Sequence, residues 1–407
     1  MPPLKNVTFI TTGQPTTNPR LVKEVDTLIA QGYNVKVICC FYQYWAQAFD
    51  VQITRKYPGI YTYCGGSPIK GVTRYYLTRI RQKLAFILST RTKKFGIAEN
   101  AISRTHAEAL KFAKKFKSDL YIAHNLGALP AAVIAARFHG AKVGYDAEDM
   151  HSGQFTTVND PNYLLNCYIE EKYFPATNYF TVASPLIGEE YRRLYPYLAP
   201  VVIDNVFPRV RVPFKSADSG PLRLFWFSQT VGPERGLEAV IIAMAQVRSP
   251  VELHLLGFCS SVYRNELYAL AAANGLGKAQ LYFHDPVPAD KLFSFASGFH
   301  IGIAGETGTT LNRDICLTNK LFVYVQTGLA VLASDTRAQS LFLRTFPGIG
   351  ILYPKDGGGC IASAIGHYAN NREILTEIRK ANYQLGQKTL NWENESEKFL
   401  AVIHRLD

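Results

Sequence analysis

The chain has 407 residues, of which 47% are hydrophobic and 19% are charged, and it is long enough to form two globular domains. No apolar run approaches the roughly 18 residues of a membrane span, and the N-terminal stretch lacks the layout of a signal peptide. The formal net charge is +12, but no zinc-finger or RNA-recognition pattern accompanies it, which argues against nucleic acid as a partner. Seven scattered cysteines without metal-site spacing indicate reduced, mostly buried thiols in a cytoplasmic protein.

Alternating strand and helix patterns fill the first half of the chain and predict βαβ units with a parallel sheet. A strand is expected at 7–13, followed by a helix at 19–32 with Leu21, Val25 and Leu28 on one face, and by a strand at 35–41. Beyond residue 96 the expected elements are a helix at 97–116, a strand at 119–125, a helix at 127–138, a strand at 141–149, a helix at 162–173, a strand at 179–185, a helix at 186–194 and a strand at 201–205.

The segment 74–94 carries seven basic residues, and no acidic residue occurs between Asp50 and Glu99. Residues 1–205 as a whole carry 24 Lys and Arg against 15 Asp and Glu, a net charge of +9. Apolar residues alternate with the basic ones in this segment, which predicts an amphipathic helix. Such a helix suits an anionic membrane surface or a phosphorylated lipid substrate; the alternative is a solvated helix that packs on its own domain.

A break in the alternating pattern at 206–221 has three prolines and an SADSG turn cluster, which predicts a linker. A second βα series follows it. Its strands are expected at 222–230, 251–258, 281–287, 300–306 and 330–335, with helices from about 236, at 261–274, at 289–297 and from 319. Two such domains in tandem suggest facing parallel sheets with a cleft between them.

Polar and glycine-rich residues gather directly after the predicted strands. In an open parallel sheet the ligand site lies beyond the carboxyl ends of the strands, so these residues are candidates for binding. They lie at Thr11 to Arg20, His124-Asn125, Asp146 to His151, Ser228 to Gly236, Glu306 to Thr310 and Thr318 to Lys320.

Two helix starts in the second half are candidate anion sites. Asn319-Lys320 follows a possible N-cap at Thr318, and Arg235-Gly236 follows a strand and a turn. Free N–H groups at a helix start, together with a nearby cation, suit a phosphate or diphosphate. The alternatives are a capped, solvated crossover helix at the first and a surface arginine beside a turn glycine at the second.

The segments that carry these residues resemble, in order and over almost the whole chain, the retaining GT4 family of GT-B glycosyltransferases. The resemblance lies in SQTVGPERGLE, LYFHDPVPADKLFSFASGFHIGIAGE and LTNKLFVYVQTGLAVLASD, and earlier in TGQPTTNPRLVKEVDTLIAQGYNVKVI, DLYIAHNLGALPAA and VGYDAEDMHSG. It implies two Rossmann-like doubly wound domains facing a cleft. They would be an acceptor-binding domain at 1–205, a linker at 206–221, a nucleotide-sugar domain at 222–388 and a C-terminal helix at 389–407 that packs back on the first domain.

The resemblance also implies roles for individual residues. Glu306 would contact the donor sugar and His124 would lie near the transferred sugar, both as catalytic residues, while Arg235 would hold the donor diphosphate. The other expected donor-binding residues are Gly13, Ser228, Gln229, Gly236, His284, Thr307, Gly308, Asn319 and Lys320. The expected acceptor-side residues are Asn18, Arg20, Asp146, Glu148, Asp149 and His151.

One departure from the family pattern stands out. The second glutamate of the family's paired-glutamate motif, which usually binds the ribose, should fall at Val323. Its absence leaves ribose recognition and the identity of the donor open. The resemblance implies no essential metal and no cofactor besides the nucleotide-sugar donor, although Asp146 to Asp149 could pass for a metal-binding acidic motif.

The expected function is transfer of a sugar from a nucleotide diphosphate to a glycan or lipid-linked acceptor with retention, as in envelope polysaccharide or lipopolysaccharide synthesis. The enzyme would be cytoplasmic and peripheral at the inner face of the membrane, which it would contact through residues 74–94. Two alternatives are a sugar-nucleotide epimerase or hydrolase on the same fold, and a glycan-binding scaffold that has lost catalysis. Slow donor hydrolysis would favour an enzyme, and nucleotide binding without turnover would favour the scaffold.

Overall fold

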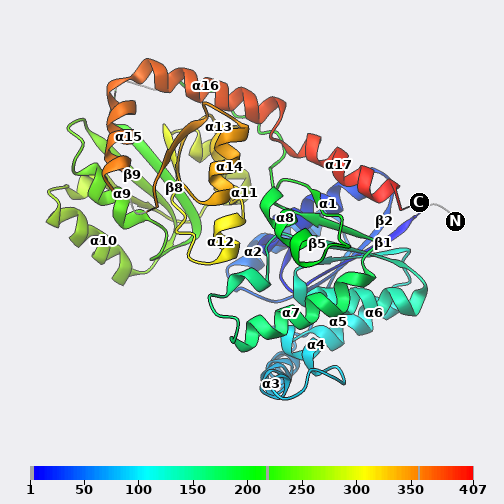
Figure 1. Cartoon of the computed structure of the whole chain (residues 1–407). Helices are drawn as coiled ribbons and strands as arrows, with labels where there is room; N and C mark the ends of the chain where they lie inside the picture. Colours follow the sequence, from blue (N-terminus) through cyan, green and yellow to red (C-terminus); the bar gives the residue numbers. More distant parts are fainter. Residues whose placement is uncertain (1–3, 217–219, 356–357, 407) are drawn as a thin grey trace. The chain divides into compact units, whose positions relative to one another are not determined.

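The computed structural model describes residues 4–216, 220–355 and 358–406, and these form two compact units (Figure 1). Unit 1 comprises residues 1–204, 310–312 and 396–407, and unit 2 comprises 205–309 and 313–395. Each unit is an α/β domain built on one fully parallel sheet. The predicted fold class, two Rossmann-like parallel-sheet domains, is confirmed.

Unit 1 holds a seven-stranded sheet in the order β3-β2-β1-β4-β5-β6-β7. Its strands are β1 (Asn6–Thr11), β2 (Asn34–Cys40), β3 (Tyr61–Cys64), β4 (Leu120–His124), β5 (Lys142–Ala147), β6 (Tyr179–Val182) and β7 (Val201–Val202). Its helices are α1 (Pro19–Ala30), α2 (Ala46–Lys56), α3 (Val72–Ser89), α4 (Ile97–Ile102), α5 (His106–Lys115), α6 (Leu129–His139), α7 (Pro161–Tyr173) and α8 (Pro185–Leu194). β1 pairs with β2 on one side and β4 on the other, so the strand order reverses between β1 and β4.

Unit 2 holds a six-stranded sheet in the order β10-β9-β8-β11-β12-β13. Its strands are β8 (Leu222–Val231), β9 (Val251–Cys259), β10 (Leu281–His284), β11 (Ile301–Ala304), β12 (Ala330–Ser334) and β13 (Gly350–Tyr353). Its helices are α9 (Leu237–Met244), α10 (Ser261–Ala273), α11 (Ala289–Ala296), α13 (Asn319–Thr327), α14 (Arg337–Thr345), α15 (Gly358–Asn370) and α16 (Arg372–Lys388). The short helix α12 (Leu311–Ile315) begins in unit 1, and its residues from 313 onward belong to unit 2. The last helix, α17 (Trp392–His404), begins in unit 2, and its residues from 396 onward belong to unit 1. Here the strand order reverses between β8 and β11.

Two expectations for the first half need correction. The single helix expected at 97–116 is two helices, because Ser103 adopts an extended conformation that ends α4 before α5 begins. The prediction also omitted α2 and β3, because the alternating pattern did not reveal them. β3 is only four residues long and half-buried. The strand and helix types predicted for the other segments are confirmed within a few residues.

The segment 206–221 has no helix or strand in its described part, and residues 217–219 lie outside the described residues. It is held along unit 2 by its carbonyl groups: Gln326 Nε2 donates to Phe207 O (2.8 Å) and Tyr383 Oη donates to Val212 O (2.9 Å). All seven cysteines are free, and four of them are buried. Among the described helices, none is both long and apolar enough to cross a membrane.

Candidate functional site

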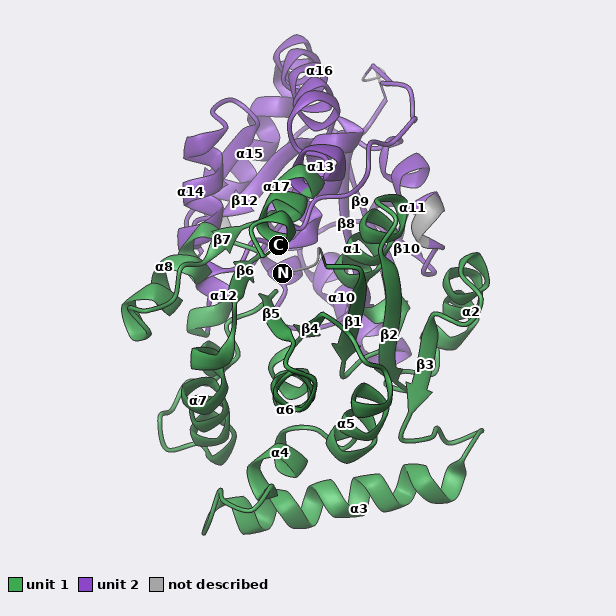
Figure 2. Cartoon of the chain, turned by 90° about the vertical axis from the view of Figure 1, so that its right-hand side faces the viewer, with its two compact units in different colours: residues 1–204, 310–312, 396–407 green, residues 205–309, 313–395 purple. Residues whose placement is uncertain are grey.

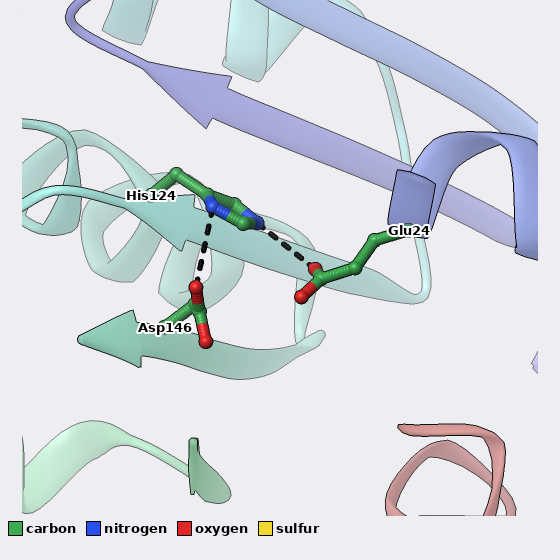
Figure 3. Close-up of side chains that lie close together, drawn as sticks. All are labelled: Glu24, His124 and Asp146. Carbon is green, nitrogen blue, oxygen red and sulfur yellow. Dashed lines mark hydrogen bonds and ion pairs between the residues drawn. The ribbon is translucent and has the colours of Figure 1, made fainter. Parts of the chain in front are cut away.

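A buried charge cluster lies where the strand order of unit 1 reverses (Figure 3). His124 is the last residue of β4, and Asp146 lies opposite it near the end of β5. Glu24 comes from α1, and its Oε2 lies 2.9 Å from His124 Nε2, while Asp146 Oδ2 lies 3.5 Å from His124 Nδ1. Arg20, one turn before Glu24 on the same helix face, donates from Nε and Nη2 to both oxygens of Asp146 (2.6 and 2.7 Å). The structure therefore brings together the predicted residues Arg20, His124 and Asp146.

Burial shifts the pKa of each member of the cluster and neighbouring charges oppose the shift; at Glu24 burial prevails and raises the pKa, although His124 and Arg20 lower it. Burial alone would lower the pKa of His124, but the carboxylates of Glu24 and Glu148 raise it to about 10, so the imidazole is protonated at neutral pH. Burial would raise the pKa of Asp146, but Arg20 and His124 hold it below its usual value. Burial lowers the pKa of Lys23 to about 7. The imidazolium can thus stabilise negative charge nearby and is a poor proton acceptor.

Glu24, His124 and Asp146 are the one set of metal-ligating side chains that converge among the described residues. Both Asp146 oxygens are already held by the Arg20 guanidinium, and Thr181 Oγ1 donates to one of them (2.5 Å). A protonated imidazole also offers no lone pair to a cation. The donor set does not fit a metal ion.

The acceptor-side residues beyond β5 are tied down by hydrogen bonds. Glu148, whose side chain is 23% exposed, reaches His124 Nδ1 with Oε1 at 3.4 Å. Asp149 accepts from Asn312 Nδ2 (3.0 Å), and His151 Nε2 accepts from Leu126 N (3.1 Å). Burial lowers the pKa of His151, which agrees with a neutral ring acting as acceptor. These hydrogen bonds fix the predicted acceptor-side loop, residues 148–151, at the end of β5.

A strained residue follows His124 directly. Asn125 has φ 69° and ψ 151°, a region populated almost only by glycine, which costs about 1–3 kcal/mol. Its Oδ1 accepts from Thr11 Oγ1 (3.1 Å), Thr12 N (3.2 Å) and Thr12 Oγ1 (2.9 Å), which fixes the loop after β1 to the end of β4. Strained backbone residues cluster at functional sites, and this one directly follows His124.

The two remaining unit 1 predictions lie in the same loop. Gly13 follows β1, and its carbonyl accepts from Cys40 N (3.0 Å); a Cβ there would lie 2.7 Å from Thr17 Oγ1. Asn18 caps α1, accepting from Leu21 N (2.9 Å). The Nδ2 atom of the same amide is buried without a hydrogen-bond partner.

A second polar cluster lies where the strand order of unit 2 reverses. Glu306 follows β11, and Lys320, on the first turn of α13, reaches its Oε1 with Nζ at 2.7 Å. The same Nζ lies 5.6 Å from the ring centre of Trp226, a fully buried residue of β8. Ser334 at the end of β12 fixes the Glu306 backbone, because its Oγ donates to Glu306 O (2.7 Å) and accepts from Glu306 N (2.9 Å). Three strands and one helix start thus position the pair.

The loop that carries Arg235 and Gly236 touches the loop that carries Glu306. A Cβ on Gly305 would lie 3.0 Å from Arg235 O, and one on Gly236 would lie 3.4 Å from Gly305 O, so the two loops pack backbone to backbone. Glu234, one residue earlier, has φ 59°, which is a strained value for a side chain of this size. Arg235, Gly236 and Glu306 are therefore brought together as predicted neighbours of one site.

Several polar groups around this pair lack protein partners. Within the described part of unit 2, Trp226 Nε1, Thr307 Oγ1 and Thr318 Oγ1 are buried without a hydrogen bond. No side-chain hydrogen bond or ion pair among the described residues engages Ser228, Gln229, Arg235 or Asn319. An unmet buried polar atom costs about 1–3 kcal/mol. Buried polar atoms without a hydrogen bond occur elsewhere in both units too, but here they lie beside an ion pair at the carboxyl end of a parallel sheet, a place that a polar ligand would complete.

Two other predicted donor-binding residues, His284 and Gly308, contact other parts of unit 2. His284 ends β10, where its Nε2 lies 3.0 Å from His254 Nδ1 and the two rings stack. Gly308 has φ 62° and lies against Lys355 and Asp314. Val323, at the position of the family's second glutamate, is fully buried on α13. An apolar core residue therefore occupies the position where the resemblance led us to expect a glutamate.

Sequence reasoning missed Glu24 and Lys23 in unit 1, and Trp226 and Ser334 in unit 2. For Lys23 and Glu24 a signal existed: with Arg20 they occupy positions i, i+3 and i+4 on the buried side of α1. Trp226 and Ser334 carry no comparable signal, since each lies within an apolar strand.

The two parallel-sheet domains have the GT-B fold of glycosyltransferases. No protein-family model and no curated protein sequence matches the chain. Among solved structures, Anabaena HepE in complex with UDP and glucose is 13% identical, with a TM-score of 0.72 over 98% of this chain and all of that one. Sucrose-phosphate synthase from Thermosynechococcus elongatus is 14% identical, with a TM-score of 0.67 over 99% of both chains. The lipopolysaccharide outer core galactosyltransferase WaaB is 11% identical, with a TM-score of 0.64 over 99% of this chain and all of that one.

Proposed function

We propose that the chain is a metal-independent, retaining glycosyltransferase of the GT4 type. It transfers a sugar from a nucleotide diphosphate to a glycan or lipid-linked acceptor. The observation that carries the proposal is the cluster around Glu306 and Lys320, where buried polar atoms lack protein partners at the end of a parallel sheet. HepE has been solved with UDP and with UDP-glucose, so uridine is the first nucleotide to test.

The chemistry of this site is electrostatic. Cleavage of a glycosyl–phosphate bond develops negative charge on the diphosphate and positive charge on the sugar. Arg235, Lys320 and the free N–H groups at the start of α13 would stabilise the diphosphate, and Glu306 would hold the donor sugar. The ion pair with Lys320 orients the Glu306 carboxylate before the donor arrives.

Unit 1 supplies the acceptor side of the proposal. His124 is held as a cation by Glu24 and Glu148, so its role is to stabilise charge near the transferred sugar rather than to remove a proton. The polar loop at Asp149 and His151 would contact acceptor hydroxyls. The net charge of +9 in residues 1–205 favours an anionic or lipid-linked acceptor at the inner face of a membrane in the cytoplasm.

A thermal-shift panel tests the donor site. The protein is mixed with UDP-, GDP-, ADP-, CMP- and dTDP-sugars, with and without magnesium, alongside Arg235→Ala and the exposed control Arg248→Ala. A ligand at a hundred times its dissociation constant adds about 2.7 kcal/mol of stability, which raises the unfolding midpoint measurably. One nucleotide class should raise the midpoint of the wild type and of Arg248→Ala but not of Arg235→Ala. No shift with any nucleotide would refute the donor site.

A further inference from the structure

Helix α3 packs with its small and polar face inward and its large aliphatic face outward. The residues buried against α4 and neighbouring segments are Tyr75, Thr78, Ala85 and Ser89. Its large aliphatic residues are between 47% and 60% exposed: Leu77, Ile80, Leu84, Ile87 and Leu88. These five positions, spaced i, i+3, i+7, i+10 and i+11, form one stripe along the helix. A surface helix of a globular domain normally has the reverse arrangement.

The apolar stripe continues into a groove between α3 and the segment that leads to α4. The groove has a volume of about 420 Å³, and Leu77, Leu84, Leu88, Phe95 and Ile97 are among its lining residues. Phe95 is 93% exposed and has φ 57°, an unfavourable value for an aromatic residue. Figure 2 shows α3 running across one end of unit 1 as the outermost helix of that unit.

Basic side chains border the stripe on both sides. On a helical projection Arg79 and Lys83 lie along one edge, and Arg74 and Arg81 lie along the other. Arg81 pairs with Glu108, and the exposed Arg79 donates from Nη1 to Tyr75 Oη (2.8 Å). Arg74 and Lys83 are exposed and make no side-chain hydrogen bond or ion pair with the described residues. The exposed Arg91 and Lys94 extend the basic border past the end of the helix, toward Phe95. Aliphatic residues between two rows of cations match a bilayer interface, which offers phosphates at its surface and acyl chains beneath.

We propose that α3 is an in-plane membrane anchor that inserts its aliphatic stripe and Phe95 into the interface of an anionic bilayer. The bordering arginines and lysines then contact lipid phosphates. This deepens the peripheral contact included in the proposed function, but it does not depend on donor binding. A second copy of the chain would have to bring a similarly basic surface against this one, and the charge repulsion disfavours such a dimer.

Co-sedimentation with vesicles tests the anchor. The full-length protein is mixed with pure phosphatidylcholine vesicles or with vesicles that contain 30% phosphatidylglycerol. We expect binding to the anionic vesicles at least tenfold tighter than to the neutral ones. The double variant Leu77→Ser/Leu84→Ser should weaken binding to anionic vesicles at least tenfold at constant net charge. The double variant Arg74→Gln/Lys83→Gln should weaken it while reducing its salt dependence.

Matched controls separate insertion from other causes. Phe138→Ser removes an aromatic side chain that is 63% exposed on α6 and should leave vesicle binding unchanged. All substituted side chains are exposed, so the unfolding midpoints and the nucleotide-induced shifts should match those of the wild type. Equal binding by wild type and Leu77→Ser/Leu84→Ser would overturn the inference. A lipid-free dimer that the same double variant dissociates, seen by sedimentation velocity, would also overturn it.

Discussion

The charge cluster of unit 1 and the ion pair of unit 2 occupy equivalent places, each where the strand order of a parallel sheet reverses. Each also has buried polar atoms without a hydrogen bond, among them Glu24 Oε1 and Asn18 Nδ2 in unit 1, but the two differ in how many charged partners hold them. In unit 1 both oxygens of Asp146 are held by Arg20, and His124 lies between carboxylates. In unit 2 the pair of Glu306 and Lys320 is surrounded by buried polar atoms without partners.

This difference suggests that the unit 1 cluster serves mainly stability and the unit 2 cluster mainly ligand binding. A network whose charges are mutually compensated stabilises its own domain and presents a fixed electrostatic surface. Buried polar groups without hydrogen bonds lower the free energy of unfolding, and a ligand that bonds to them when it binds raises it again. Substitutions in unit 1 should therefore act mainly on folding, and substitutions at Lys320 mainly on ligand binding.

Removal of Arg20 should have the largest effect on stability. Arg20→Ala removes the guanidinium that pairs with the buried Asp146 and Glu24, and breaking a buried pair in this way costs about 3–5 kcal/mol. Urea unfolding monitored by circular dichroism measures the loss. The control Lys56→Ala breaks the exposed pair with Asp26 and should cost under about 1 kcal/mol. Equal losses in the two variants would show that the buried network does not stabilise unit 1.

Introducing at position 323 the glutamate that the family resemblance led us to expect should destabilise unit 2. Val323 is fully buried on α13, so Val323→Glu places an unpaired carboxyl in the core at a cost of about 3 kcal/mol. Val323→Thr is the control, because a threonine hydroxyl can bond to the helix carbonyl one turn earlier and should cost less. A Val323→Glu protein that kept its stability and bound the donor more tightly would mean that this side chain reaches the ligand.

Glu170 offers a contrast within unit 1, since its partners are an amide and hydroxyls rather than a guanidinium. Its Oε1 accepts from Ser152 N and Tyr191 Oη, and its Oε2 accepts from Tyr195 Oη, all at 3.2 Å. Burial raises its pKa to about 7 despite these bonds. The folded protein therefore binds a proton that the unfolded chain has released. The stability from this group is complete below about pH 4.5 and is lost as the pH rises through 7.

Glu170→Gln should remove that pH dependence. The amide mimics the protonated acid, so the variant should match the wild type at pH 5 and exceed its stability by about 2–3 kcal/mol at pH 8.5. Unfolding curves at both pH values measure the difference, with the exposed neighbour Glu171→Gln as control. A variant less stable than the wild type at pH 8.5 would show that the carboxylate form is the one that the fold requires.

The sequence predicted the sheets of both units because strands, helices and their glycine and proline boundaries are local features. It also placed His124, Asp146 and Arg235 at strand ends, since in parallel sheets those positions share one edge. Lys23 and Glu24 share the buried side of α1 with Arg20 at positions i, i+3 and i+4, but charged residues on a helix usually face solvent, so the prediction left them out. It revealed that α3 is amphipathic, but periodicity does not say which face packs inward. That information depends on tertiary contacts with α4, and here those contacts select the small face.

Replacement of Lys320 is the smallest of these changes in free energy and the sharpest test of the contrast between the units. Lys320→Met keeps the aliphatic stem over Trp226 and removes the cation that faces Glu306. Donor affinity, measured by calorimetry with the nucleotide sugar that raises the unfolding midpoint most, should fall tenfold to a hundredfold, or about 1.4–2.7 kcal/mol. Arg248→Ala, which removes an exposed cation elsewhere in unit 2, should leave that affinity unchanged. The stability loss of Lys320→Met in the absence of donor should be smaller than that of Arg20→Ala, because Lys320 pairs with one buried carboxylate, Glu306, whereas Arg20 pairs with two. If Lys320→Met instead lost stability and kept its affinity, the pair in unit 2 would be structural like the network in unit 1, and the ligand would have to be sought elsewhere.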